Sequence, residues 1–173
     1  MEKIKWGIIG PGNIANNFAD GLKGSYSGQL VSIASKSEDR RKNFGDKYDI
    51  HPDFRFDSYE DIINSEHIDA IYISTPHTLH AEWTIKAAGK GKHILCEKPG
   101  AINFNEGKKI IDAVREAGVF YMEGFMYRCH PQIPKLVEII KNKMIGDVIS
   151  IEASFGFDMG KTCLLYTSDA ADD

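Results

Sequence analysis

A lysine in the tripeptide Glu97-Lys98-Pro99 has the chemistry and the setting of an acid–base group. It follows a short apolar run, and the proline restricts the turn that would present its ammonium group. Such a group can accept or deliver a hydroxyl proton, and it can stabilise a developing alkoxide once water is excluded. The alternative is a solvated lysine that pairs with Glu97. We expect Lys98 to be catalytic and Glu97 to support the turn and a bound cofactor.

A glycine-rich turn over residues 10–15, with the sequence GPGNIA, is the second chemical feature. Gly10 would let the chain turn sharply after an apolar run, and Gly12 would let the backbone approach a pyrophosphate closely. The helix that follows would direct its first N–H groups, with Asn13 and Ile14, at the negative charge. Tight turns between a strand and a helix also use glycine. The strand expected before this turn and the helix expected after it favour dinucleotide binding.

The composition is that of a globular enzyme. The 173 residues are 42% hydrophobic and 27% charged, enough for one domain with a full core and part of another. The net charge of −4 argues against nucleic-acid binding, and no apolar run approaches the length of a membrane span. Cys96, Cys129 and Cys163 are too few and too scattered for a disulfide framework or a zinc site. We therefore expect a protein of the reducing cytoplasm, without a signal peptide.

Short apolar runs alternate with helical segments through most of the chain. We expect strands over residues 4–9, 30–35, 54–56, 70–74, 93–96 and 119–123, with helices between them. This alternation predicts an α/β fold, a doubly wound parallel sheet of the Rossmann type. Ligands of such sheets bind beyond the carboxyl ends of the strands, where Gly10, Ser35, Thr75 and Lys98 fall.

The end of the second expected strand bears on the choice between two dinucleotides. NAD enzymes of this fold usually place an acidic residue there, which binds the ribose 2′-hydroxyl. This chain has Ser35 and Lys36 instead, with Arg40 one turn into the next helix. Hydroxyl and cationic groups suit a 2′-phosphate, whereas an ordinary solvated helix start would explain the same residues without a ligand. We expect NADP rather than NAD.

The turn after the fourth expected strand supplies further candidates for cofactor binding, Thr75, Pro76 and His80. His80 could instead pack or cap at the start of the following helix. The spacing of His77 and His80 could ligate a metal ion, but no third ligand is evident, so we expect no metal site.

Three motifs in register resemble the Gfo/Idh/MocA oxidoreductases: the glycine-rich turn, the segment STPHTLH over residues 74–80, and Glu97-Lys98-Pro99. The resemblance covers residues 3 to about 157. It implies hydride transfer between NADP(H) and a carbinol carbon. The segment MEGFMYRCHPQ, residues 122–132, is similar to members that act on aldoses and trans-dihydrodiols. The implied substrate is therefore a sugar, a polyol or a trans-dihydrodiol.

The resemblance also divides the chain into domains. Residues 1–123 are expected to form the dinucleotide-binding Rossmann domain. Residues 124–162 would begin a truncated α+β substrate domain, with a helix over 131–143 and a long alternating strand over 147–157. The family would build an open antiparallel sheet from that strand, and we expect the whole protein to be a homo-oligomer through this sheet.

Residues 163–173, with the sequence CLLYTSDAADD, resemble no element of this fold. They look like a translated transposase sequencing adapter, so we expect a non-native tail and a truncated gene. The family's other catalytic residues, an aspartate and a histidine one helical turn apart, would then lie beyond the break. A natural polar tail is the alternative.

Two functions of other classes compete with a dehydrogenase. A non-catalytic NAD(P)-binding sensor or regulator would use the fold without chemistry, and Lys98 argues against it. A methyltransferase would usually place an acidic residue at the end of the second strand, where this chain has Ser35. Tyr127 and Arg128, just beyond the sixth expected strand, could orient sugar hydroxyls or simply tie two domains together.

Overall fold

The computed structural model describes residues 2–154 and 156 of the chain. They fall into two compact units that divide between Arg128 and Cys129. This division lies slightly beyond residue 123, where the sequence places the end of the dinucleotide-binding domain. The adapter-like residues 163–173 lie outside the described part of the chain.

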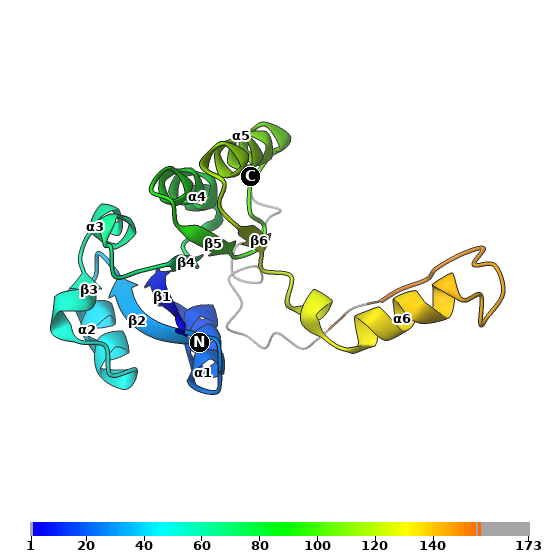
Figure 1. The fold of residues 1–173 in the computed structure, drawn as a ribbon, viewed down its shortest axis with the longest axis horizontal. Helices are drawn as coiled ribbons and strands as arrows, with labels where there is room; N and C mark the ends of the chain where they lie inside the picture. The colour runs from blue at the N-terminus through cyan, green and yellow to red at the C-terminus, as the bar shows by residue number, and fades with distance from the viewer. Residues whose placement is uncertain (1, 155, 157–173) are drawn as a thin grey trace, which may run out of the picture. The chain divides into compact units, whose positions relative to one another are not determined.

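A parallel sheet of six strands forms the centre of the larger unit (Figure 1). Its strands are β1 Ile4–Ile9, β2 Gly28–Ala34, β3 Arg55–Phe56, β4 Ala70–Ile73, β5 His93–Cys96 and β6 Tyr121–Glu123. They lie in the order β3-β2-β1-β4-β5-β6, and every neighbouring pair is parallel. The chain winds outward from β1 to β3 and then outward on the other side from β4 to β6. The doubly wound Rossmann sheet expected from the sequence is thus confirmed.

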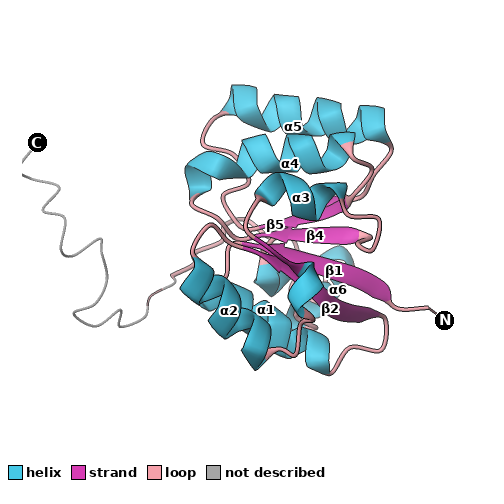
Figure 2. Ribbon diagram, turned by 90° about the vertical axis from the view of Figure 1, so that its left-hand side faces the viewer, coloured by secondary structure: helices cyan, strands magenta, loops and turns pink. Residues whose placement is uncertain are grey.

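Helices cover both faces of this sheet (Figure 2). They are α1 Asn13–Lys23, α2 Glu38–Lys47, α3 Tyr59–Asn64, α4 His80–Gly89 and α5 Phe104–Ala117. α1 and α2 lie on one face, and α3, α4 and α5 lie on the other. Side-chain oxygens of Ser37, Ser58 and Asn103 accept backbone N–H groups where α2, α3 and α5 begin. No helix in the described part of the chain is both long and apolar enough to cross a membrane.

Two buried apolar clusters, one on each face, hold these layers together. On the face of α3 and α4, Ile73 of the sheet and Trp83 of α4 belong to one cluster. On the face of α1 and α2, Ile33 of the sheet packs with Ala15 and Phe44. The central strand β4 is buried along its whole length because helices cover both of its sides.

The edge strands β3 and β6 are shorter than the sequence predicts. Phe54 belongs to a 3-10 turn, Pro52–Phe54, that precedes β3, and β6 begins at Tyr121 rather than at Val119. An edge strand has a neighbour on one side only, so fewer of its residues find a hydrogen-bonding partner.

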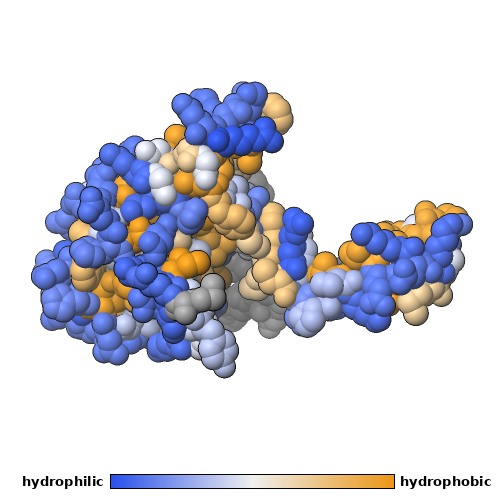
Figure 3. Space-filling model, in the orientation of Figure 1, coloured by the Kyte–Doolittle hydropathy of each residue, from blue (hydrophilic) through white to orange (hydrophobic). Residues whose placement is uncertain are grey.

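The described residues of the smaller unit form one helix, α6 Gln132–Lys141, within the helix expected over 131–143. Several of its apolar side chains are exposed, among them Leu136 by 48% and Val137 by 42%, and orange side chains gather along it in Figure 3. The strand expected over 147–157 does not form in its described part, so that prediction is wrong there. An extended segment becomes a strand by hydrogen bonding to a neighbour, and no described segment of this unit pairs with it.

Candidate functional site

One row of paired residues crosses the sheet at the carboxyl ends of its strands. Ala34 pairs with Ile9, Ile9 with Ile73, Ile73 with Cys96, and Cys96 with Glu123. The residues that directly follow this row are Ser35, Gly10, Ser74, Glu97 and Gly124. The sheet therefore brings the glycine-rich turn, the serine after β2, the turn after β4 and the Glu97-Lys98 pair to a common edge.

The two glycines of the turn are needed for different reasons. Gly10 has φ +91°, and a Cβ atom there would lie 2.9 Å from the Ser74 carbonyl oxygen. The Ser74 hydroxyl donates to the Gly10 carbonyl oxygen at 2.7 Å and ties the turn to the end of β4. Gly12 has an ordinary φ of −90°, and a Cβ atom there would meet no atom of the described residues within 4 Å. Packing within the protein does not require glycine at this position, but a ligand that approaches the backbone would.

The N-terminus of α1, directly beyond Gly12, is open. Helices α2, α3 and α5 begin with a capping side chain, and α4 has Glu82 in its first turn. Among the described helices of this unit, α1 alone has neither a capping side chain nor an acidic residue there. Its first N–H groups, from Asn13 onward, and the positive end of its dipole can therefore bind an anion. Together with Gly12, they fit the pyrophosphate of a dinucleotide.

The end of β2 presents a hydroxyl group and two cations. Ser35 is buried, and its Oγ accepts the Ser37 N–H at 3.2 Å, which leaves the hydroxyl proton for another acceptor. The guanidinium of Arg41 donates to the Ser35 carbonyl oxygen at 2.6 Å and so supports the loop. Lys36 and Arg40 are exposed, and neither forms an ion pair with another described residue. Both cations can therefore bind an anion from solution.

Lys98 follows Glu97 at the end of β5, and its side chain is exposed. The carboxylate of Glu97 is engaged elsewhere: Oε1 accepts the phenol O–H of Tyr72 at 2.6 Å, and Oε2 accepts the Lys98 backbone N–H at 3.3 Å. Glu97 therefore holds the turn, while the Lys98 ammonium has no ionic partner within residues 2–154 and 156. An ammonium in this position can act on an oxygen atom of a substrate.

Tyr72 is a support of this turn that sequence reasoning does not identify. It is 2% exposed on β4, and its ring stacks on that of Phe18 in α1 with centroids 4.2 Å apart. Burial and the hydrogen bond to Glu97 raise the pKa of Tyr72, so the phenol stays protonated and donates. A tyrosine within a buried strand signals that its hydroxyl needs a partner, but it does not say which distant residue accepts.

The chain after Lys98 is held by β6. The Gly100 N–H donates to Glu123 Oε1 at 2.9 Å, and a Cβ atom on Gly100 would collide with the Tyr121 hydroxyl. The Gly124 N–H donates to the carbonyl oxygen of Cys96, the last residue of β5, at 2.7 Å. These contacts determine the path of the backbone on both sides of Lys98.

His80 lies behind this edge and does not face it. Its side chain is fully buried, with Nε2 2.8 Å from the Thr75 carbonyl oxygen and Nδ1 2.8 Å from the Pro99 carbonyl oxygen. A neutral imidazole can donate to only one of these oxygens, whereas an imidazolium donates to both. His80 thus links the turn after β4 to the turn that carries Lys98. Its burial favours the alternative that His80 packs at the start of α4, and a direct contact with a cofactor stays a prediction.

The remaining residues of the turn after β4 have less defined surroundings. Thr75 is 7% exposed, and its Oγ1 has no hydrogen-bond partner among the described residues. Pro76 is exposed and precedes a 3-10 turn, His77–Leu79. Thr75 and Pro76 therefore stay predictions as cofactor contacts. Within the described part of the chain, no group of three or more His, Cys, Asp or Glu residues could hold a metal ion.

Tyr127 and Arg128 are exposed in a 3-10 turn, Met126–Cys129, beyond β6. The Tyr127 ring lies 5.9 Å from that of Phe125, and the Arg128 N–H donates to the Phe125 carbonyl oxygen at 3.0 Å. Neither side chain forms a hydrogen bond with another described residue, so their role toward a substrate stays a prediction.

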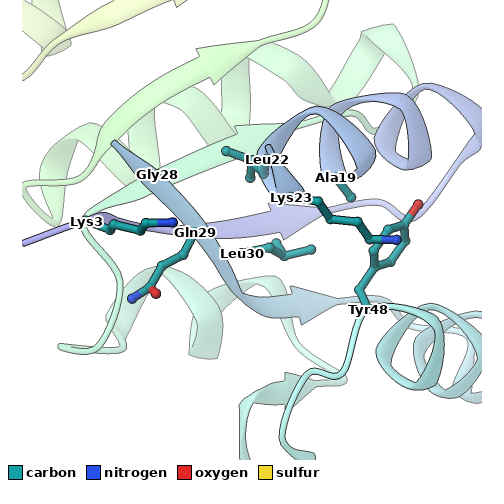
Figure 4. Close-up of a pocket in the computed structure, with 8 residues that line it drawn as sticks. All are labelled: Lys3, Ala19, Leu22, Lys23, Gly28, Gln29, Leu30 and Tyr48. Carbon is teal, nitrogen blue, oxygen red and sulfur yellow. The ribbon is translucent and has the colours of Figure 1, made fainter. Parts of the chain in front are cut away.

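A pocket of about 210 Å³ lies at the other end of the sheet (Figure 4). It is lined by Lys3, Ala19, Leu22, Lys23, Gly28, Gln29, Leu30 and Tyr48. These residues come from the amino ends of β1 and β2, the C-terminal half of α1 and the residue after α2. The Tyr48 hydroxyl already donates to Asn16 Oδ1 at 2.9 Å. This pocket is therefore separate from the edge that carries Gly12 and Lys98.

Comparison with known proteins agrees with this geometry. The pattern of the Gfo/Idh/MocA oxidoreductase family, with an NAD-binding Rossmann fold, matches residues 4–125. The chain belongs to this family. It is 35% identical over 159 residues to trans-1,2-dihydrobenzene-1,2-diol dehydrogenase of Xenopus tropicalis, covering 91% of this chain and 48% of the relative. It is 33% identical over 170 residues to D-xylose 1-dehydrogenase (NADP(+)) 2 of Haloferax volcanii, covering 98% and 49%.

The family fold is also seen in solved structures. A 3-ketoreductase from Actinomadura kijaniata, in complex with NADP, is similar with a TM-score of 0.75 and 31% identity. The match covers 84% of this chain and 46% of that one. This Gfo/Idh/MocA chain thus spans about half the length of the curated relatives it matches.

Proposed function

We propose that this protein is an NADP-dependent dehydrogenase that transfers a hydride between the dinucleotide and a carbinol carbon of a sugar, a polyol or a trans-dihydrodiol. One observation carries the proposal: the open glycine turn after β1 and the ammonium of Lys98 after β5, which pairs with no described residue, share an edge of the sheet. A single strand, β4, separates β1 from β5. A dinucleotide-binding turn and an acid–base group are therefore held on one rigid element.

The backbone around Gly12, Asn13 and Ile14 would hold the pyrophosphate at the N-terminus of α1. Gly10 would maintain the turn, and the open space beside Gly12 would admit the phosphates. When bound, the nicotinamide supplies the hydride acceptor or donor. The protein's part is to place the substrate hydroxyl and to move its proton.

Ser35, Lys36 and Arg40 support NADP over NAD. The residue that follows β2 is Ser35 and not a carboxylate; Glu38 and Asp39 stand in the first turn of α2, but among the described residues neither pairs with Lys36 or Arg40. A carboxylate would repel a 2′-phosphate, whereas a hydroxyl group and cations bind it. The relative from Haloferax volcanii is named for NADP(+), and the similar 3-ketoreductase was solved with NADP, which also supports this choice.

Lys98 would act on the substrate oxygen. A hydride leaves the carbinol carbon as the hydroxyl proton is removed, so a nearby base lowers the barrier, and an ammonium stabilises the developing alkoxide. Glu97 is a poor candidate for that base because its carboxylate already accepts the Tyr72 O–H and the Lys98 N–H. Its part is to position Lys98.

The test is the variant Lys98→Ala in protein that includes the whole substrate domain. We expect NADP affinity within a few-fold of the parent and turnover lower by roughly 10²–10⁴-fold. Lys109→Ala is the matched control, because Lys109 is exposed on α5 and forms no ion pair with another described residue. Turnover of Lys98→Ala within about threefold of the parent would remove Lys98 from the mechanism.

The substrate class and the assembly follow from the relatives rather than from the described residues. We infer that residues beyond 123 begin the domain that binds substrate and joins subunits into a homo-oligomer. The names of the two curated relatives, a dihydrobenzenediol dehydrogenase and a xylose dehydrogenase, support a substrate with neighbouring hydroxyl groups. The expected cytoplasmic location stays a prediction.

A further inference from the structure

Tyr59 lies beside the end of β2, although the two segments are far apart in the sequence. It is the first residue of α3, three positions after the end of β3. Strand β3 pairs with β2, and the Ser35 N–H donates to the Phe56 carbonyl oxygen at 3.0 Å. The loop that presents Tyr59 and the loop that presents Lys36 and Arg40 thus leave the same edge of the sheet side by side.

The Tyr59 ring is held in place from within the protein. It packs edge-to-face on Trp83 of α4, with centroids 5.0 Å apart and planes at 90°. The Ser58 hydroxyl accepts the N–H groups of Glu60 and Asp61, which determines how the first turn of α3 begins. The phenol oxygen of Tyr59, by contrast, has no hydrogen-bond partner among the described residues. A ring held in a fixed position therefore carries a hydroxyl donor that no described residue accepts.

The cations of the neighbouring segment, Lys36 and Arg40, lie on the same side of the sheet edge as this ring. The Lys36 ammonium lies 5.8 Å from the centroid of the Tyr59 ring. Burial raises the pKa of Tyr59, and the positive charge of Arg40, the third residue of α2, partly opposes that shift. The adjacent carboxylate of Glu60 pairs with Lys86 of α4 at 3.1 Å and is thereby engaged away from the two cations.

We propose that the hydroxyl of Tyr59 binds the 2′-phosphate of NADP together with Lys36 and Arg40, and that Tyr59 determines the choice of cofactor. This inference rests on the proposed function. Two flexible cations attract any anion, whereas a fixed neutral donor adds a directed hydrogen bond to a phosphate oxygen. The phenol stays protonated at neutral pH, and no described residue accepts a hydrogen bond from it. NAD, which lacks the phosphate, would gain nothing from it.

The test is Tyr59→Phe in the chain of residues 1–173, which keeps the ring on Trp83 and removes only the hydroxyl. Calorimetry should show about tenfold weaker binding of NADP and binding of NAD within about twofold of the parent. The small probe 2′-AMP should weaken like NADP, and 5′-AMP should not change. The thermal midpoint should match that of the parent. Tyr26→Phe is the control, because Tyr26 is 98% exposed between α1 and β2.

The outcomes separate this inference from the function on which it rests. If the parent binds NADP more tightly than NAD but Tyr59→Phe binds both as the parent does, Tyr59 has no part in the choice and the proposed function stands. An equal loss for NADP and NAD also overturns the inference, because it would mean a structural or adenine-directed role. A parent that shows no preference for NADP overturns both.

Discussion

Substitutions at the two glycines of the turn after β1 test folding and ligand binding separately, because Gly10 is needed for the turn and Gly12 for the ligand. A Cβ atom at Gly10 would lie 2.9 Å from the Ser74 carbonyl oxygen and 3.2 Å from the Thr75 nitrogen, at φ +91°. The left-handed conformation alone costs an alanine about 1–2 kcal/mol, and the collision with backbone atoms adds a similar amount. We therefore expect Gly10→Ala to lower the free energy of unfolding by about 2–4 kcal/mol.

Gly12→Ala should behave in the opposite way. Its Cβ atom would enter open space at φ −90°, so the backbone is unstrained. Alanine is a poorer N-cap than glycine but reduces the entropy of the unfolded chain, so the free energy of unfolding should stay within about 1 kcal/mol of the parent. The added methyl group would occupy the space that a pyrophosphate needs. An overpacking cost of about 1–3 kcal/mol corresponds to NADP binding weaker by roughly 5–150-fold.

Urea unfolding, monitored by tryptophan fluorescence, measures the free energy of unfolding. Titration with NADP in a calorimeter measures the cofactor affinity of the same samples. Gly89→Ala is the matched control, because a Cβ atom there also meets nothing within 4 Å but lies at the C-terminus of α4. It should leave NADP affinity unchanged. NADP binding by Gly12→Ala that equals the parent would refute the assignment of Gly12 to the pyrophosphate. A Gly10→Ala variant as stable as the parent would refute the geometry of the turn.

Two further predictions concern the ends of β2 and β5. Ser35→Asp should shift cofactor preference toward NAD by at least about tenfold, because a carboxylate repels the 2′-phosphate and accepts hydrogen bonds from the ribose hydroxyls. The shift should be smaller at high salt. Tighter binding of NAD than of NADP by the parent would contradict this reasoning. Burial raises the pKa of Cys96 to about 12, so its thiolate fraction at pH 8 is about 10⁻⁴. Cys129, by contrast, is exposed to the reagent. Peptide mapping after iodoacetamide treatment at pH 8 should find Cys129 alkylated and Cys96 modified only in urea, and equal labelling of the native protein would contradict the burial.

Local sequence by itself determined the elements of the larger unit and the turn chemistry at their ends. The apolar runs before Gly10, Ser74 and Glu97 predict buried strands, and the glycine turn predicts the open start of α1, because both depend on residues close together in the chain. The prediction failed over residues 147–154, where alternation alone suggested a strand. A strand needs a hydrogen-bonding neighbour, and the pattern of one segment does not supply it.

Only the tertiary structure decided which of these side chains meet. The order β3-β2-β1-β4-β5-β6 places Tyr72 of β4 against Glu97 after β5, so that the carboxylate next to Lys98 holds the turn and, among the described residues, does not pair with the ammonium. The same sheet buries His80 between two carbonyl oxygens and brings Tyr59 to Lys36. These contacts join residues from separate turns of the chain. Strand order and packing decide which residues meet, and no local pattern of residue types encodes either of them.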